Sequence, residues 1–156
     1  MTPQPQKTKT RAETQAAAAP HAGPNPDTDT GVDPAPIQEI LKKNKREIKM
    51  GLKVCAHCSL CAESCFLYAA SHDPKYMPSY KFINSIGRLY RKKGRVSREE
   101  LLKIRDIVWH DCVLCTRCYC PFGIDIPSLI SLARQACRSQ GISREYDREP
   151  MRADTN

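Results

Sequence analysis

Two clusters of cysteines constrain the fold of this chain more than any other feature of its sequence. Nine of its 156 residues are cysteine, and eight of these nine fall into two short runs. In both runs the first three cysteines are separated by two residues each, so that one loop can present three thiolates to a single metal centre. The runs consist of Cys55, Cys58, Cys61 and Cys65, and of Cys112, Cys115, Cys118 and Cys120.

The first run has the spacing C-x2-C-x2-C-x3-C, which is the bacterial iron–sulfur pattern with Phe66 in place of the usual trailing proline. In proteins with two clusters, the fourth cysteine of such a run ligates the other cluster. A structural zinc site is the alternative, but it needs only four thiolates in tetrahedral geometry. The three-plus-one spacing, found twice, therefore favours iron–sulfur clusters, and we expect two [4Fe–4S] clusters.

The second run departs from this pattern at its end. It keeps both two-residue gaps and has Pro121 after the fourth cysteine, but only Tyr119 separates Cys118 from Cys120. The chain is thus two residues short at a place where ligand geometry matters. Two outcomes stay open. Either Cys120 still reaches its cluster because Pro121 anchors the outgoing chain, or that cluster keeps three cysteines and is a [3Fe–4S] centre or holds a labile iron.

The remaining cysteine and the residues beside the runs have simpler interpretations. Cys137 falls on one apolar helical face, so we predict a buried core thiol rather than a rescue ligand or a redox thiol. With eight cysteines available, His57 and His110 are not expected to ligate iron. Trp109 and Tyr119 flank the second run, where we expect them to shield a cluster from water.

Helical periodicity dominates the sequence around the cysteine runs. Apolar residues recur at helical spacing in four stretches, and no convincing alternating strand is present. Ser97 and Glu100 form an S-x-x-E capping box, and Pro127 suits the first turn of the last helix. We therefore predict a mostly α fold with helices over about residues 36–50, 78–94, 97–110 and 127–141, the first of them ending at Gly51.

Composition divides the chain into three parts. Residues 1–36 hold seven of the twelve prolines and almost no large apolar side chains, so they cannot bury enough apolar surface to offset the entropy of ordering. We predict a disordered tail over 1–36 that is rich in Pro, Thr and Ala, a two-cluster domain over 37–146 and a flexible C-terminal tail over 147–156. A domain of this size has a modest core, which bound clusters would crosslink.

Targeting signals and charge narrow the function classes. No apolar signal region follows the N-terminal charges, and no stretch approaches the length of a membrane span. The paired cysteine spacing therefore indicates metal binding in a reducing cytosol rather than disulfides, and we expect a cytoplasmic protein. The net charge of +8 would be offset in part by the clusters, since each oxidised four-thiolate cluster brings about −2. This weakens a nucleic-acid function.

A basic run between the cysteine runs has two interpretations: a solvated helix end, or a docking patch for an acidic redox partner or a membrane surface. A zinc-stabilised basic nucleic-acid-binding module is the alternative function, although only Tyr90 offers an aromatic platform there. A thiol–disulfide enzyme would need a spare dithiol, and only Cys137 is unassigned. The basic run consists of Arg88, Arg91, Lys92, Lys93, Arg95 and Arg98.

The segment from about residue 37 to residue 141 resembles helical ferredoxin domains. It is most similar to iron–sulfur subunits of the heterodisulfide reductase type: the small iron–sulfur subunit, the N-terminal part of the larger one, and the related subunit of the sulfite-reductase-associated membrane complex. The stretches that carry the resemblance are residues 55–66, 73–78 and 112–126. The resemblance implies an alpha-helical ferredoxin fold with two [4Fe–4S] clusters.

The resemblance also implies crossed ligation and a role. One cluster would take Cys55, Cys58, Cys61 and Cys120, and the other would take Cys65, Cys112, Cys115 and Cys118. The chain would be a non-catalytic electron-transfer subunit of an oxidoreductase complex, with no nucleic-acid partner. It would pass electrons from a flavoprotein, a ferredoxin or a membrane quinone or haem subunit to a catalytic subunit with cysteine-rich domains. A membrane subunit would hold it at the inner membrane face.

Overall fold

The computed structural model describes residues 31–144, so that most of the predicted tail 1–36 and all of the predicted tail 147–156 lie outside the described residues. Within 31–144 the regular elements are helical and no strand is present. The longer helices are α1 (Pro34–Lys43), α2 (Lys45–Val54), α3 (Phe66–Ser71), α4 (Pro78–Asn84), α5 (Ile86–Arg91), α6 (Arg98–Arg105) and α7 (Ile126–Arg138). Two single turns, η1 (Leu60–Ala62) and η2 (Pro74–Tyr76), and a π-helical segment, η3 (Asp106–His110), complete the set.

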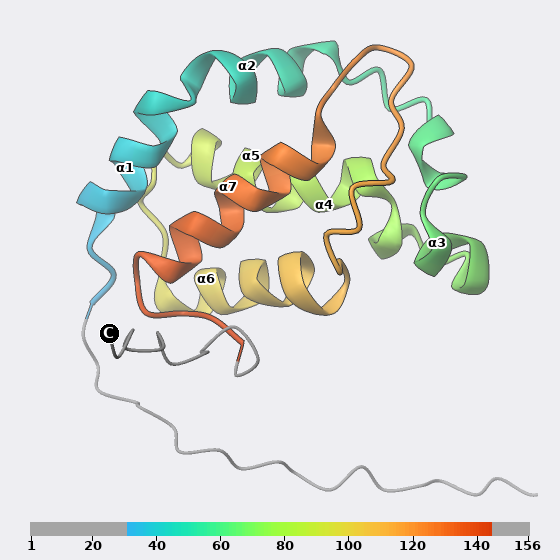
Figure 1. Cartoon of the computed structure of the whole chain (residues 1–156). Coiled ribbons are helices and arrows are strands. Elements are labelled where there is room, and N and C mark those ends of the chain that lie inside the picture. The colour runs from blue at the N-terminus through green and yellow to red at the C-terminus, as the bar shows by residue number, and fades with distance from the viewer. Residues whose placement is uncertain (1–30, 145–156) are drawn as a thin grey trace, which may run out of the picture.

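Helix α7 is the centre of the molecule, and α1, α2, α4, α5 and α6 all contact it. In Figure 1 it crosses the middle of the view, with α1 and α2 on one side and α6 on the other. Its apolar face carries Ile130, Ala133 and Cys137, none of which is exposed. The core around it includes Phe82 of α4 and Ile104 of α6. Each large apolar side chain buried in this way stabilises the fold by roughly 1.5–3 kcal/mol.

The helix predicted over residues 36–50 is in fact two helices. The first turn of α1 begins at Pro34, where the Asp33 side chain accepts a hydrogen bond from the backbone N–H of Ala35. The break lies at Asn44, whose side-chain amide donates to the carbonyl of Ile40 at 2.9 Å. This local bond competes with continuation of the helix. Because α1 begins at Pro34, the predicted boundary between residues 36 and 37 falls inside this helix.

Gly51 does not end the first helical stretch, and that expectation is wrong. It lies inside α2, which continues to Val54. A Cβ at this position would come within 2.8 Å of Leu129 Cδ1 of α7. Only glycine allows α2 to pack this closely against α7. The contact offsets the loss of stability that glycine causes in a helix interior.

The later helices follow the prediction more closely. The stretch over 78–94 is broken at Ser85, whose hydroxyl donates to the carbonyl of Lys81 at 2.6 Å. The capping box of α6 is confirmed, because Ser97 and Glu100 exchange hydrogen bonds between side chains and backbone. Pro127 does lie in the first turn of α7, where the Asp125 side chain accepts from the backbone N–H of Ser128.

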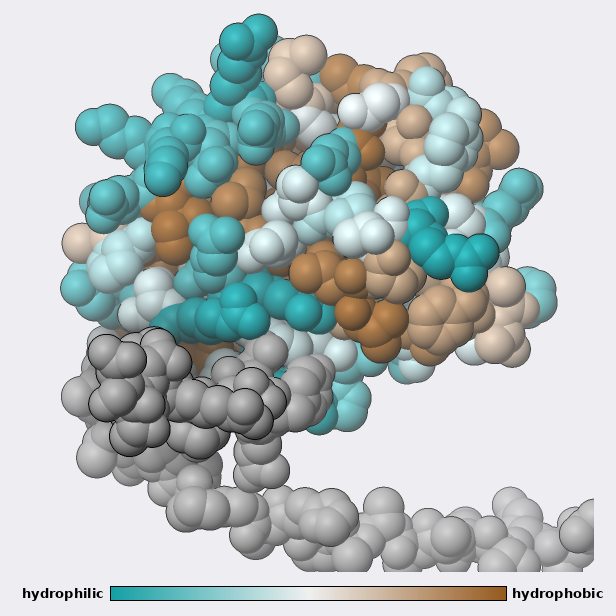
Figure 2. Space-filling model, in the orientation of Figure 1, coloured by the Kyte–Doolittle hydropathy of each residue, from teal (hydrophilic) through white to brown (hydrophobic). Residues whose placement is uncertain are grey.

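The two cysteine runs lie at the same end of the molecule. In Figure 1 the connection after α2 and the long connection before α7 pass beside each other, next to α3. The basic run, between α5 and α6, lies at the opposite end beside α1, where Gln38 donates to the carbonyl of Lys93. In Figure 2 hydrophobic side chains are more frequent on the half of the visible face that holds the cysteine connections, while hydrophilic ones occur on both halves and dominate the other.

Candidate metal centres

The two cysteine runs adopt the same backbone turn. The third and fifth residues of each run have positive φ: 53° at His57 and 62° at Ser59 in the first, 55° at Leu114 and 60° at Thr116 in the second. Positive φ is uncommon for residues other than glycine. In turns built on such residues, successive backbone N–H groups can face one concave side, which suits a bound anion. We call residues 55–65 the first loop and residues 112–120 the second loop.

A first cavity brings together cysteines of both loops. Besides cysteines, Ser79 and Phe82 of α4 and Phe122 and Ile124 of the second connection lie on its wall. The cysteines that line it are Cys55, Cys58, Cys61 and Cys120. Three members of the first loop therefore share this cavity with the last cysteine of the second loop.

A second cavity has the complementary set. Lys81 of α4 and Ile130 of α7 lie on its wall, together with residues of both loops. The cysteines that line it are Cys65, Cys112, Cys115 and Cys118. Helix α4 lies between the two cavities, because Ser79 and Phe82 line the first and Lys81 lines the second.

Ser64 links the two loops at the place where the last cysteine of each loop enters the other loop's cavity. Its hydroxyl donates to the carbonyl of Cys61 at 2.8 Å and accepts from the backbone N–H of Tyr119 at 3.1 Å. Tyr119 is the single residue between Cys118 and Cys120, and those two cysteines line different cavities. The short spacing is thus compatible with the two thiols serving two centres.

Burial makes the thiols of Cys118 and Cys55 hard to ionise in the absence of a metal. Burial raises the pKa of Cys118 to about 12, and the neighbouring thiols of Cys112 and Cys115 also act to raise it. Burial also raises the pKa of Cys55, against a lowering by the hydrogen bond from the backbone N–H of His57. In the second loop the backbone N–H of Leu114 donates to Cys112 Sγ at 3.4 Å. A cationic metal core would supply the charge that turns these thiols into thiolates.

The donor set fits a cluster of several metal atoms. Each cavity is surrounded by four thiols, which is the ligand number of a [4Fe–4S] cluster. Across residues 31–144, no three His, Cys, Asp or Glu side chains converge closely enough to hold one metal ion. The four thiols of each cavity line one shared space.

The second loop is fastened to α7 by Arg134, a residue that no motif in the sequence singled out. This arginine is only 9% exposed. Its Nε donates to the carbonyl of Val108 at 2.9 Å, and its Nη2 donates to the carbonyl of Cys112 at 2.7 Å. Its guanidinium lies 5.2 Å from the centre of the Trp109 ring. The signal in the sequence is a charged residue on the apolar stripe of α7, four positions after Ile130.

Lys81 is a second residue that the motifs did not reveal. Its ammonium lies 3.5 Å from Cys65 Sγ and donates to it, and the residue is 2% exposed.

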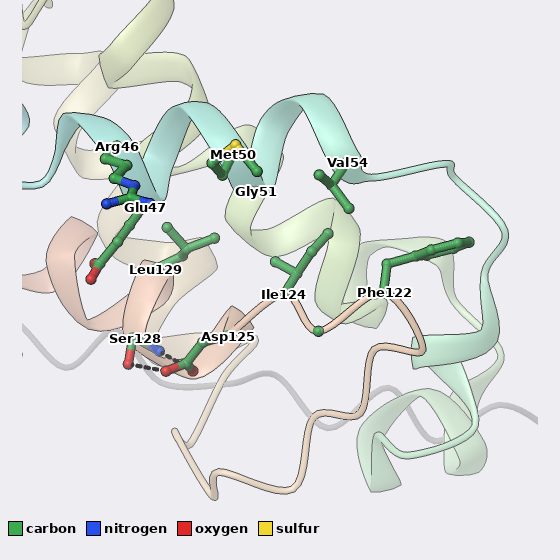
Figure 3. A pocket seen from close by; sticks show the side chains of 11 residues that line it. Arg46, Glu47, Met50, Gly51, Val54, Phe122, Ile124, Asp125, Ser128 and Leu129 are labelled. Atoms are coloured by element: carbon green, nitrogen blue, oxygen red, sulfur yellow. Dashed lines mark hydrogen bonds between the residues drawn. The ribbon is translucent and has the colours of Figure 1, made fainter.

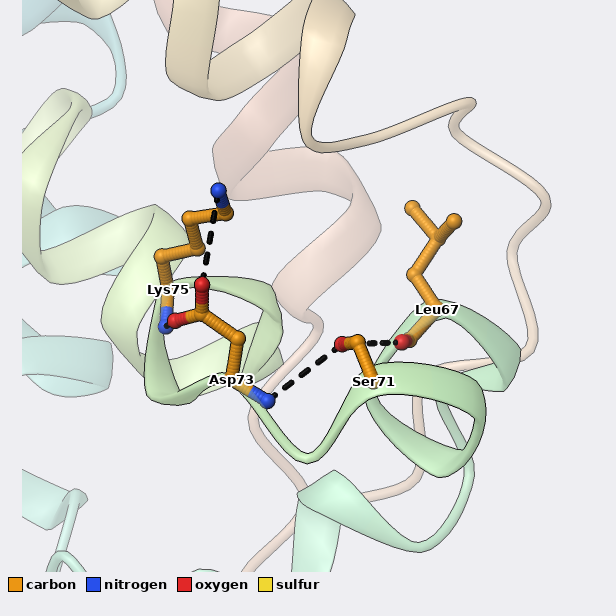
Figure 4. A network of polar contacts seen from close by, with 4 residues as sticks. All are labelled: Leu67, Ser71, Asp73 and Lys75. Carbon is orange, nitrogen blue, oxygen red and sulfur yellow. Dashed lines mark hydrogen bonds and ion pairs between the residues drawn. The ribbon is translucent and has the colours of Figure 1, made fainter. Parts of the chain in front are cut away.

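The turn that precedes α4 is fixed by a short polar network (Figure 4). There Ser71 Oγ donates to the carbonyl of Leu67 at 2.8 Å, and the carboxylate of Asp73 pairs with Lys75 at 3.4 Å.

The remaining predicted residues fall in different places. Cys137 is a core thiol, as predicted: it is fully buried, it lines neither cavity, and burial raises its pKa to about 12. Trp109 is buried under Arg134 but lines neither cavity, so its shielding of a cluster stays a prediction. Tyr119 is 63% exposed, so its ring does not have the buried, shielding position that was predicted. Its backbone N–H instead holds the loop through the bond to Ser64. His57 and His110 are both exposed.

Comparison with known proteins agrees with this donor set. Residues 51–124 match the family model of the 4Fe-4S dicluster domain. Within residues 31–144, no helix has the length and apolar character needed to span a membrane. No solved structure matches the chain.

Two curated relatives carry the comparison further. The chain is 29% identical over 124 residues to "Hdr-like menaquinol oxidoreductase iron-sulfur subunit 2" of Archaeoglobus fulgidus. It is 31% identical over 123 residues to "Hdr-like menaquinol oxidoreductase iron-sulfur subunit" of Archaeoglobus profundus. Each match covers 70% of this chain but 22% of the relative, so the chain spans about a fifth of the length of these relatives. The chain is thus similar to the 4Fe-4S dicluster domain over residues 51–124 and to the Hdr-like iron–sulfur subunits over most of its length, in agreement with its resemblance to heterodisulfide reductase-type subunits.

Proposed function

We propose that this chain is a non-catalytic electron-transfer subunit that holds two [4Fe–4S] clusters with crossed ligation. The observation that carries the proposal is the composition of the two cavities, each of which gathers three cysteines of one loop and the last cysteine of the other. The first cluster would be held by Cys55, Cys58, Cys61 and Cys120. The second would be held by Cys65, Cys112, Cys115 and Cys118.

The clusters supply one-electron chemistry, and the chain tunes and insulates it. Backbone N–H groups that the positive-φ residues turn inward would donate to cluster sulfur, which stabilises the reduced state. Buried Phe82 and Ile130 exclude water from the sides of the cavities that face the core. The cysteines Cys58 and Cys115, by contrast, are exposed. Each cluster would thus have one edge near the surface, where an electron can enter or leave.

The surface around the two loops suits a partner protein. Large apolar side chains lie exposed within or next to the loops, with 48% to 63% of each accessible to solvent. Exposed apolar groups that gather in one region mark interaction sites. These residues are Leu60, Phe66, Val113, Tyr119 and Phe122.

A groove beside the first cavity extends this surface. It has a volume of about 460 Å³ and lies between α2 and the segment that leads into α7 (Figure 3). Phe122 and Ile124 line both the groove and the first cavity. Met50 of α2 is 54% exposed there. A redox partner seated at this end of the molecule would lie close to the first cluster.

The names of the relatives suggest the setting. Both are iron–sulfur subunits of a menaquinol oxidoreductase. We propose that this chain works in a comparable complex, at the cytoplasmic side of the membrane and attached through a membrane subunit. It would take electrons from a quinone or haem subunit, a flavoprotein or a ferredoxin, and pass them to a subunit with cysteine-rich catalytic domains.

Anaerobic purification with metal and sulfide analysis tests the proposal. We expect a brown protein with close to eight irons and eight acid-labile sulfides per chain, two clusters at four each. Reduction by dithionite should bleach the colour and give the paramagnetic signal of reduced clusters, and air-free oxidant should reverse both. A colourless protein with about two zinc ions and negligible iron would contradict the proposal, and would favour the zinc-stabilised nucleic-acid module instead.

A further inference from the structure

Helix α4 passes between the two cavities and presents different side chains to each. On the side of the second cavity, α4 presents Lys81, whose ammonium lies 3.5 Å from Cys65 Sγ. On the side of the first cavity it presents Ser79 and Phe82, which carry no charge. Among the described residues, the only ionisable group on the wall of the first cavity apart from its cysteines is His57, which is exposed.

Lys81 is a buried cation that forms no ion pair with a carboxylate within residues 31–144. The ion pairs of that part of the chain are formed by Lys75, Lys92 and Arg105. The charge of Lys81 acts to lower the pKa of the Asp111 carboxyl group, but burial has the larger influence and raises that pKa. The ring of Tyr76 lies 5.8 Å from the ammonium. A buried charge has to be compensated by a nearby opposite charge. The nearest group able to provide one is the set of thiolates in the second cavity.

A four-thiolate [4Fe–4S] cluster provides that charge, and provides more of it when reduced. The oxidised unit carries about −2, and one added electron makes it about −3. An ammonium next to a ligand sulfur therefore interacts more favourably with the reduced cluster than with the oxidised one. The interaction is strong because Lys81 is 2% exposed and solvent screens it little.

We propose that Lys81 makes the second cluster the electron-holding member of the pair. An electron that enters at the first cluster would then pass to the second. The first cluster returns to its oxidised state and the second is reduced by one electron, with no bond made or broken and no proton required. This inference rests on the proposed function, since it presupposes a cluster in each cavity. It assigns to Lys81 the role of a fixed charge that orders the two reduction potentials.

Potentiometric titration followed by electron paramagnetic resonance tests the inference, after iron content has been measured. A Cys112→Ser variant identifies the signal of the second cluster, because Cys112 belongs to that cluster under both crossed and local ligation. In the wild-type protein the second cluster should be reduced first. In Lys81→Met its reduction equilibrium constant should fall at least about tenfold, which is ~59 mV for one electron. The first cluster should change much less, because α4 separates it from Lys81.

Matched variants separate charge from packing. Lys81→Arg keeps the charge and should keep the order of reduction. Lys81→Gln keeps a hydrogen-bond donor without the charge and should behave as Lys81→Met does. Lys75→Met removes a nearby cation whose side chain is 46% exposed and already paired with Asp73. It should leave the equilibrium constant of the second cluster within about twofold, as expected for a screened surface charge.

The outcomes are distinguishable. Wild-type protein without iron would overturn the proposed function itself. Wild-type protein with two clusters of which the first is reduced first would overturn only the inference about Lys81. So would an unchanged potential in both neutral variants, or loss of four irons in Lys81→Met, Lys81→Gln and Lys81→Arg alike, since the last result would show that lysine is needed for packing rather than for charge.

Discussion

The first and second loops share one backbone turn but sit in different surroundings. Both have positive φ at their third and fifth residues. The first loop continues directly from α2, and Cys55 closes that helix through a bond from its N–H to the carbonyl of Gly51. The second loop follows the π-helical segment and is tied to α7 by Arg134. The comparison teaches that the ligand loop itself is a repeated unit, while its stability and electrostatics come from residues outside the motif.

Removing the metal should affect both loops, and its effect should be larger than that of any single substitution. Four thiols surround each cavity, and those of Cys61, Cys65 and Cys112 are buried. Without clusters these walls lose the centre that holds them, because metal-binding energy in such sites is folding energy. We expect iron-free protein to lose its cooperative thermal unfolding transition, as measured by circular dichroism. An equally sharp transition at the same temperature in the iron-free protein would show that the helices hold the loops by themselves.

Replacing Arg134 should destabilise the second loop more than the first. Arg134→Met removes two hydrogen bonds from a charged donor to buried carbonyls of Val108 and Cys112, for which we expect a loss of about 3 kcal/mol in the free energy of unfolding. Under mild oxidation the second cluster should then lose iron first. Arg138→Met is the matched control, because Arg138 is on the same helix, also lies over the Trp109 ring, and is exposed. Equal rates of iron loss from the two clusters in Arg134→Met would contradict the assignment.

Replacing Cys137 should affect neither loop. Cys137→Ala leaves a small cavity beside Leu101 in the core, and we expect a cost of about 1 kcal/mol in the free energy of unfolding. Iron content and the resonance spectrum should stay unchanged, because this thiol lines neither cavity. Loss of four irons in Cys137→Ala would show that Cys137 is a ligand after all.

The basic run should have the smallest effect on electron exchange, although it holds many of the positive charges. It lies at the end of the molecule opposite the loops, and Lys92 is already paired with Glu100. We expect Lys93→Glu with Arg95→Glu to change the rate of oxidation by ferricyanide less than about twofold at 0.1 M salt, where screening acts over about 10 Å. Arg117→Glu, within the second loop, should slow that reaction more. A larger effect from the distant pair would favour the docking-patch interpretation.

The local features of this fold could be predicted from sequence, and the long-range ones could not. The Ser97 capping box and the start of α7 at Pro127 depend on residues a few positions apart, and both were predicted. The breaks at Asn44 and Ser85 share one cause that was missed, a side chain that bonds the carbonyl four residues earlier. Such residues compete with the helix ladder, so a polar residue inside an apolar period is a usable signal.

The candidate site divides in the same way. The eight cysteines of the two loops were predicted from their spacing, which is a property of neighbouring residues. Arg134 and Lys81 were not, because what they contact is determined by how α7 and α4 pack against loops that lie far away in sequence. A lysine or arginine at a core position of a helix is the only sign of such a residue in the sequence.

Crossed ligation, in which each cluster takes its last ligand from the other loop, is tested most directly by one set of measurements. Electron paramagnetic resonance of Cys120→Ser and Cys65→Ser is compared with that of Cys55→Ser and Cys112→Ser, in oxidised protein for three-iron signals and in reduced protein for four-iron clusters. Crossed ligation predicts that Cys120→Ser alters the same cluster as Cys55→Ser, and that Cys65→Ser alters the same cluster as Cys112→Ser. If Cys120→Ser instead alters the cluster altered by Cys112→Ser, ligation is local to each loop and crossed ligation is contradicted.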